Sequence, residues 1–170
     1  MPKFKTEISN FKEGLWSYHV KIPEKIFKQL AKDGNKRTIC QIDDHKPFHG
    51  GLMPDGDGGW FIMLNKEKMQ KYKVALGQEV MVSIESDKSK YGMEMPEEFE
   101  EVLAQDIEGS TFFENLTDGK KRSLIYIVAK VKNIDKRITK AMIILDHLKA
   151  NEGKLDFKML NIAFKENNKF

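Results

Sequence analysis

Residues 16–23 of the chain read WSYHVKIP and carry the pattern from which the fold can be worked out. Apolar and polar side chains alternate along this stretch, and successive side chains of a β-strand point to opposite faces. The apolar positions are Trp16, Tyr18, Val20 and Ile22. The alternation predicts a half-buried strand, and Pro23 predicts that a helix begins there, because proline suits the first helical turn.

The same pattern recurs on either side of this stretch and predicts further short strands in the first half of the chain. Alternation is visible at residues 4–8 and 80–84, and β-branched or aromatic residues are frequent in residues 37–42 and 60–64. Residues 54–59, PDGDGG, tolerate positive backbone φ angles. They predict a hairpin turn between the runs 37–42 and 60–64.

Two short helices are expected between these strands. Pro23 begins the first and Gly34 ends it, and the second spans residues 66–76 with Gly77 after it. Five or six strands with so few helices favour a small barrel or sandwich over a doubly wound parallel sheet.

The pattern changes at residues 91–96, YGMEMP, where glycine and proline interrupt the alternation. From there on, apolar residues recur at three- and four-residue spacing, which is typical of amphipathic helices. The predicted helices span residues 97–116 and 156–165, and between them lies a run that residues 117–119 cap and whose apolar positions extend over residues 124–148, with Asn133 as a candidate break. The sequence therefore predicts an α+β protein with a β-barrel domain over residues 1–93 and a helical segment over residues 94–170.

The net charge of +3 is too small to imply a nucleic-acid or membrane partner, but the charge is unevenly distributed. Residues 94–117 carry eight acidic and no basic side chains, whereas residues 118–149 carry nine basic and three acidic ones. The simpler interpretation is mutual neutralisation across adjacent helices. The alternative is a basic face for a phosphate backbone, which would consist of Lys120, Lys121, Arg122, Lys130, Lys136, Arg137 and Lys140.

Three features predict a cytoplasmic location without membrane insertion. The longest uncharged and mostly apolar run, Ser123 to Ala129, is far shorter than the roughly 20 residues of a membrane-spanning helix. Residues 1–5, MPKFK, have neither the apolar stretch nor the cleavage site of a secretory signal. The single cysteine, Cys40, excludes an intrachain disulfide and suits a reducing compartment.

We find no motif for catalysis, and we expect no catalytic residue, cofactor or metal. The glycine-rich residues 54–59 lack the spacing of phosphate-binding loops, and an EF-hand there would need a glutamate where Lys66 stands. Pro47 lies between His45 and His49 and argues against a shared helical face for metal ligands.

The aromatic residues of the strands suggest a ligand pocket inside the barrel. Small-molecule sites are mostly apolar and contain a few polar anchors. The residues of this hypothetical pocket are Trp16, Tyr18 and Trp60, with Arg37 and His49 as polar anchors. Filling the core is the alternative role of the same aromatic side chains.

Several blocks of sequence, taken in order, resemble a bacterial family with two parts. They read GLWSYHVKIP at residues 14–23, PDGDGGWFI at 54–62, LGQEVMV at 76–82, YGMEMPEEF at 91–99, GKKR at 119–122 and KRI at 136–138. Over nearly its whole length the chain is similar to a family with an N-terminal domain of unknown function of the 1905 type. In that family a helical segment of the bacteriocin-protection, YdeI or OmpD-associated type often follows.

The resemblance implies a split β-barrel, related in architecture to swapped-hairpin DNA-binding barrels that dimerise, and it implies no catalytic residues. The chain departs from the family in its basic helix. The C-terminal family commonly has a Thr-Arg pair before Arg-Arg-Ile, where this chain has NIDKRI at residues 133–138.

Three functions follow as hypotheses. The first is a non-enzymatic cytoplasmic binding module, which the resemblance links to stress or to bacteriocin and envelope protection. The second is a nucleic-acid-binding regulator, in which the basic residues contact phosphates and a homodimer presents the barrel. The third is a small-molecule binder, or an enzyme without a recognisable motif, that uses the aromatic interior of the barrel with Arg37 or His49 as a polar anchor. The partner is thus a small ligand, a protein or a nucleic acid, and a continuous basic stripe in space would favour the last.

Overall fold

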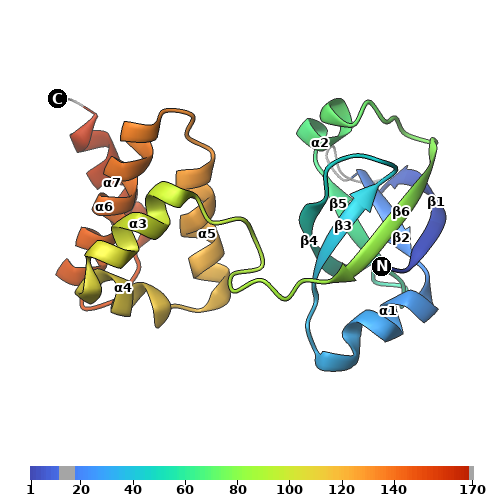
Figure 1. Cartoon of the computed structure of the whole chain (residues 1–170), viewed down its shortest axis with the longest axis horizontal. Helices are drawn as coiled ribbons and strands as arrows, with labels where there is room; N and C mark the ends of the chain where they lie inside the picture. Colours follow the sequence, from blue (N-terminus) through green and yellow to red (C-terminus); the bar gives the residue numbers. More distant parts are fainter. Residues whose placement is uncertain (12–17, 169–170) are drawn as a thin grey trace. The chain divides into compact units, whose positions relative to one another are not determined.

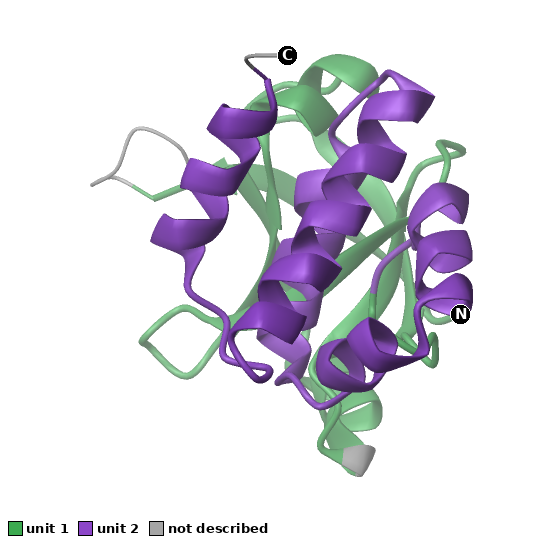
Figure 2. Cartoon of the chain, turned by 90° about the vertical axis from the view of Figure 1, so that its left-hand side faces the viewer, with its two compact units in different colours: residues 1–92 green, residues 93–170 purple. Residues whose placement is uncertain are grey.

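The chain forms two compact units, which Figure 2 shows in green and purple. The computed structural model describes residues 1–11 and 18–168. The first unit, Met1–Gly92, contains every described strand, and the described part of the second, Met93–Phe170, consists of helices and loops. The predicted α+β class, with a barrel followed by helices, is confirmed.

The described part of the first unit has six antiparallel strands that close into a barrel (Figure 1). They are β1 (Lys3–Asn10), β2 (Tyr18–Ile22), β3 (Arg37–Ile42), β4 (Phe48–Pro54), β5 (Trp60–Leu64) and β6 (Glu79–Ser86). Their order around the barrel is β1-β2-β5-β4-β3-β6, and the pairing of β6 with β1 closes it. Each strand is therefore hydrogen-bonded on both sides.

The alternation seen in the sequence determines which side chains fill the barrel. Val20 and Ile22 of β2 face the same interior as Ile62 and Leu64 of β5, and all four are buried. Each strand turns every second side chain inward, so the residues between them lie on the outer face. The interior is an apolar core.

The predicted hairpin between the runs 37–42 and 60–64 is wrong, because residues 54–59 instead connect β4 to β5. β4 also pairs with β3. Its sequence, FHGGLMP, did not predict a strand because glycine and proline are depleted in strands. A Cβ on Gly50 would lie 3.1 Å from Cγ2 of Ile62, so glycine lets β4 approach the core closely.

Short helices connect the strands of this unit. α1 (Glu24–Leu30) follows Pro23 and continues as the one-turn helix η1 (Ala31–Asp33), which ends at Gly34 with a φ of 71°. α2 (Lys66–Lys71) ends before the predicted Leu76. Lys73 has a φ of 51°, and this left-handed conformation cannot continue a helix.

The second unit contains the helices that follow the change of pattern (Figure 2). They are α3 (Glu97–Gln105), α4 (Ile107–Glu114), α5 (Asp118–Ala129), α6 (Ile134–Ala150) and α7 (Phe157–Asn167). α6 packs against each of the other four, and fully buried side chains such as Phe99, Phe113 and Leu145 form the core between them. None of the helices within the described ranges is both long and apolar enough to cross a membrane.

Side-chain caps divide the predicted long helices. The run 97–116 is two helices rather than one, because Asp106 interrupts it and its Oδ1 accepts the N–H of Gly109 at 2.8 Å. A Cβ on Gly109 would lie 2.8 Å from Cβ of Leu145, so glycine allows α4 to approach α6 closely. Asn133 caps α6 and divides the run 124–148 where the sequence suggested a break.

Candidate functional site

The residues predicted to line a pocket inside the barrel do not gather in one place. Tyr18 and Trp60 pack against the core, but they lie at opposite ends of the paired strands β2 and β5. Trp60 stacks on Phe27 of α1 with ring centroids 4.0 Å apart. Trp16 lies outside the described residues.

The interior of the barrel is filled mainly by apolar side chains. Ile8, Val20, Ile62 and Ile84 have no exposed surface. Cys40 lies among them, and burial raises the pKa of its thiol to about 12, so the thiol stays protonated and unreactive. The filled interior therefore does not support a ligand pocket inside the barrel.

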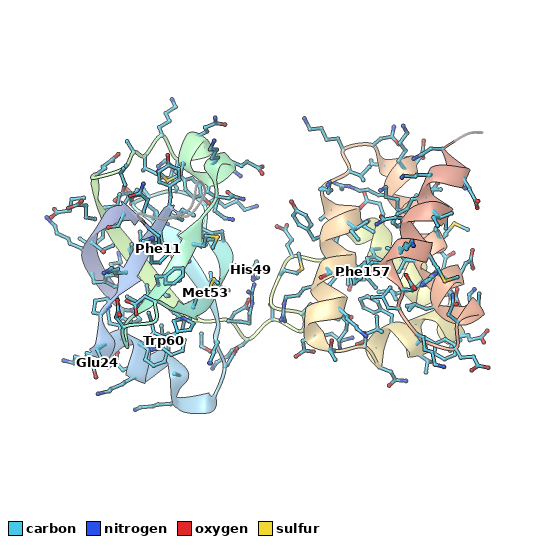
Figure 3. All side chains as sticks on the ribbon, turned by 180° about the vertical axis from the view of Figure 1, so that it is seen from behind. Phe11, Glu24, His49, Met53, Trp60 and Phe157 are labelled. Carbon is cyan, nitrogen blue, oxygen red and sulfur yellow. The ribbon has the colours of Figure 1, made fainter. Side chains whose placement is uncertain are left out.

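Arg37 and His49 lie on the outer face of the barrel, from which His49 projects in Figure 3. Nδ1 of His49 lies 2.7 Å from Oδ2 of Asp87, whose side chain is fully buried. Asp87 also accepts hydrogen bonds from Oγ and the N–H of Ser89, at 2.6 and 2.9 Å. Burial would raise the pKa of Asp87, but the hydrogen bonds from Ser89 and His49 outweigh it and lower the pKa.

These side chains fix the segment that follows β6. Arg37 donates from Nη2 to the carbonyl oxygen of Gly92 at 2.7 Å, and Asn35 donates to the carbonyl oxygen of Asp87 at 2.8 Å. Gly92 has a φ of 69°, and a Cβ there would lie 3.0 Å from Nε of Arg37. The two predicted polar anchors, Arg37 and His49, thus hold residues 87–92 against the barrel.

The predicted basic residues lie on α5, on α6 and between them, and two of them are tied to acidic residues of the same unit. Nη1 of Arg137 lies 3.3 Å from Oε1 of Glu98. Nζ of Lys121 lies 3.7 Å from Glu114 and 3.6 Å from Asp118. Both side chains are mostly buried, which gives each of them a structural role.

Three of the remaining basic residues lie near one another. Burial lowers the pKa of Lys140, and the positive charge of nearby Lys130 lowers it further. The ammonium group of Lys140 lies 4.4 Å from the ring centroid of Phe164 on α7. Lys136 and Lys140 line the same shallow pocket between α6 and α7. Lys120 and Arg122 belong to the first two turns of α5 instead.

A groove between α3 and α6 was not predicted from the sequence. It has a volume of about 580 Å³, and its apolar residues are Val102 of α3 and Ile138 and Met142 of α6. Met142 is 53% exposed and Ile138 is 36% exposed. Periodicity assigned both to the apolar face of the run 124–148. One signal in the sequence could have shown that Met142 lies at the border of this face. Asp146 follows Met142 by one helical turn, and its charge marks the edge of the apolar face.

Carboxylates surround this apolar strip. The residues that line the groove include the acidic Glu97, Glu98, Glu101, Asp106 and Asp146, and one basic residue, Lys149. A cluster of oxygen ligands can in principle hold a metal ion. No three His, Cys, Asp or Glu side chains in residues 1–11 and 18–168 are placed to hold one. The groove therefore combines an apolar strip with an acidic rim.

Ion pairs neutralise part of the acidic rim at each end of the groove. Nζ of Lys149 lies 2.6 Å from Asp106 and 3.1 Å from Asp146, and its hydrogen bond to Asp106 lowers the pKa of that carboxyl. At the other end Arg137 pairs with Glu98. The ion pairs found among the described residues include neither Glu97 nor Glu101, which lie one turn apart on α3.

Two family models match the chain, one in each unit. Residues 4–84 match the Domain of unknown function (DUF1905), and residues 92–151 match the family Bacteriocin-protection, YdeI or OmpD-Associated. The chain has the architecture of these two families, in this order. The resemblance stated from the sequence is thereby confirmed. No curated protein matches the chain.

The YdeI or OmpD-Associated match contains the whole groove, since it spans α3 to α6 and ends at residue 151. The pocket lined by Lys136 and Lys140 is only partly contained in this match, because Phe164 and Asn167 of α7 lie beyond the matched residues. Arg37 and His49 fall in the DUF1905 match. The groove is therefore built entirely from the second matched domain.

Proposed function

We propose that the protein is a non-enzymatic binding module whose helical unit takes up a helical segment of a partner protein in the groove between α3 and α6. The observation that carries this proposal is the apolar strip of Val102, Ile138 and Met142, which is open to solvent between acidic rims. Exposed apolar patches rimmed by polar groups mark interaction surfaces, and grooves between helices suit amphipathic helices.

Covering this strip would be favourable. Full burial of a methionine or isoleucine side chain contributes about 1.5–3 kcal/mol relative to exposure. Met142 has half of its surface left to bury, and Ile138 has a third. Methionine also adapts its unbranched side chain to different partners, which suits a recognition surface.

The family description points to a process that the protein would serve, but it does not identify the binding partner. Its description names bacteriocin protection, and we propose that binding in the groove serves protection of this kind or of the envelope. The cytoplasmic location and the homodimer expected from the sequence stay predictions, which fractionation and sedimentation would test.

Selection from an unbiased library of displayed helical peptides tests the proposed function. Met142→Glu places a charge in the strip, and Ile162→Glu on α7 is the matched control because Ile162 is 48% exposed and does not line the groove. We expect enriched peptides that bind the wild-type chain and the control equally and lose at least about tenfold in affinity with Met142→Glu. Failure to enrich peptides, or peptides indifferent to Met142→Glu, would contradict the proposal.

The lysine cluster supports a second candidate function, binding of nucleic acid. Lys130, Lys136 and Lys140 supply positive charge near one shallow pocket, and phosphate contacts of this kind give strongly salt-dependent affinity. Lys136→Glu with Lys140→Glu is a better test than a change at Arg137, which Glu98 holds. Fluorescence anisotropy with mixed DNA and RNA would support this function if binding at low salt is lost in the double variant. Absence of binding at low salt would exclude it.

A further inference from the structure

We infer that the groove between α3 and α6 selects a cationic amphipathic helix of about three turns, an inference that rests on the proposed function and specifies its partner. The apolar strip would receive one face of that helix, and the acidic rims would receive lysine or arginine side chains on its flanks. Each part of this description follows from a separate feature of the groove.

The charge of the groove determines which sign of charge its partner carries. The groove-lining side chains include five carboxylates and a single ammonium group. A cleft lined by one sign of charge concentrates ligands of the opposite sign and disfavours like-charged competitors. A cationic segment is therefore favoured over a neutral one, and an acidic segment is disfavoured.

The placement of Glu97 and Glu101 reinforces this selection. Acidic residues in the first turn of a helix are stabilised by the helix dipole, which accounts for Glu97 and Glu98. Glu101 lies beyond the first turn and four residues from Glu97, and like charges at this spacing destabilise a helix. A cationic side chain of a partner placed between these two carboxylates would replace the repulsion by two attractions.

The length of the groove sets the length of the partner. On α6 the groove-lining residues run from Ile138 through Met142 to Lys149. These eleven steps along an α-helix cover about 16 Å, or three turns. A partner helix would match this length with apolar side chains at positions i, i+3 or i+4, and i+7.

The two ends of the groove are not equivalent, which orients the partner's charges. Lys149 occupies one end between Asp106 and Asp146 and would repel a cation there. The carboxylates of Glu97 and Glu101 lie towards the other end, on the first two turns of α3, where the positive charge of Arg137 is already paired with Glu98. The strongest cationic contacts are therefore expected at α3, and the purely apolar contacts at Met142.

Three designed peptides of about 14 residues test this inference. They share the same leucine positions and carry lysine, glutamine or glutamate on their flanks. Binding of each labelled peptide to the full chain is followed by fluorescence anisotropy at low and moderate salt. We expect the lysine peptide to bind at least about tenfold more tightly than the glutamine peptide, with an affinity that falls with salt, and the glutamate peptide not to bind.

Variants of the chain distinguish the contribution of charge to peptide binding from that of apolar contact. Glu97→Gln with Glu101→Gln should weaken binding of the lysine peptide several-fold and leave the glutamine peptide unchanged. Glu108→Gln with Glu166→Gln removes two charges from exposed positions that do not line the groove and should change neither. Met142→Glu should abolish binding of the glutamine peptide.

The outcomes distinguish the inference from the function on which it rests. If the glutamine peptide binds as tightly as the lysine peptide and Met142→Glu abolishes both, the proposed function stands and the inference is overturned. If Met142→Glu leaves binding of the lysine peptide unchanged, the binding is charge attraction alone, and both the inference and the proposed function are overturned. The absence of any binding also overturns both. Occupation of the groove by a second copy of the chain, detected as dimerisation that Met142→Glu abolishes, also overturns the inference.

Discussion

The guanidinium group of Arg137 lies 3.3 Å from the carboxylate of Glu98 and joins α6 to α3 beside the groove. Its Nε also donates to the carbonyl oxygen of Val131 at 2.6 Å. Arg137 therefore fixes the two helices on which the groove depends.

Arg137→Leu is expected to destabilise the helical unit by about 1–3 kcal/mol, because it leaves the mostly buried Glu98 without its partner. Arg137→Lys should recover only part of the loss, since lysine cannot make the same set of bonds. Urea unfolding followed by far-UV circular dichroism measures the change. Exposed Lys136→Leu is the control and should stay within about 0.5 kcal/mol of the wild type. Equal effects at both positions would contradict this account.

His49→Ala is expected to destabilise the barrel by about 1–3 kcal/mol, because Asp87 is buried and loses one hydrogen-bond partner. Tryptophan fluorescence reports on this unit alone, since both tryptophans of the chain, Trp16 and Trp60, belong to it. Glu85→Ala, at an exposed position of β6, serves as control. Unchanged stability of His49→Ala would contradict this structural role of His49.

The helical unit should lose stability in weak acid because of His147. Burial lowers the pKa of His147, against the raising effect of Asp156, and Nε2 accepts the N–H of Asp156 at 3.2 Å. The unfolded chain therefore binds this proton more readily than the folded chain. The contribution is complete above about pH 6.5 and is lost as the pH falls from there through the lower folded pKa.

His147→Gln should flatten that part of the pH dependence, as measured by thermal unfolding across a pH series. Glutamine keeps a hydrogen-bond acceptor but does not titrate. A variant with the same slope as the wild type would show that another group is responsible.

Cys40 should not react with a thiol reagent at neutral pH in the folded protein, because its thiol is buried and its pKa is raised to about 12. Mass spectrometry after alkylation should find it modified only once the chain is unfolded in denaturant. Modification of the native protein at the rate of the unfolded one would contradict the filled core.

Much of the fold could be predicted because its causes are local. The alternation at residues 18–22 and 80–84 and the cap at Asn133 each correspond to an observed strand or helix end. β4 was not predicted because Gly50 is there for close approach to Ile62, a contact between strands that no local pattern reveals. The break at Asp106 was not predicted because the apolar residues on either side of it continue the helical spacing.

The candidate site could not be predicted because it depends on tertiary contacts. Lys136 and Arg137 are adjacent in sequence, yet Lys136 is exposed while Arg137 pairs with Glu98, 39 residues away along the chain. Likewise, Met142 lies at the border of the apolar face of α6, and only the position of α3 decides that it lines a groove. Periodicity identifies an apolar face but does not show which part of it a neighbouring helix covers.

The most direct test of the central claim is methyl NMR of the full chain during titration with the lysine-flanked peptide. Met142 and Met159 are exposed to nearly the same extent, 53% and 50%, but Met159 lies on α7 outside the groove. The account predicts that the Met142 methyl signal shifts and saturates with the peptide while that of Met159 stays in place. A stationary Met142 signal, or shifts centred on Met159, would contradict binding in the groove between α3 and α6.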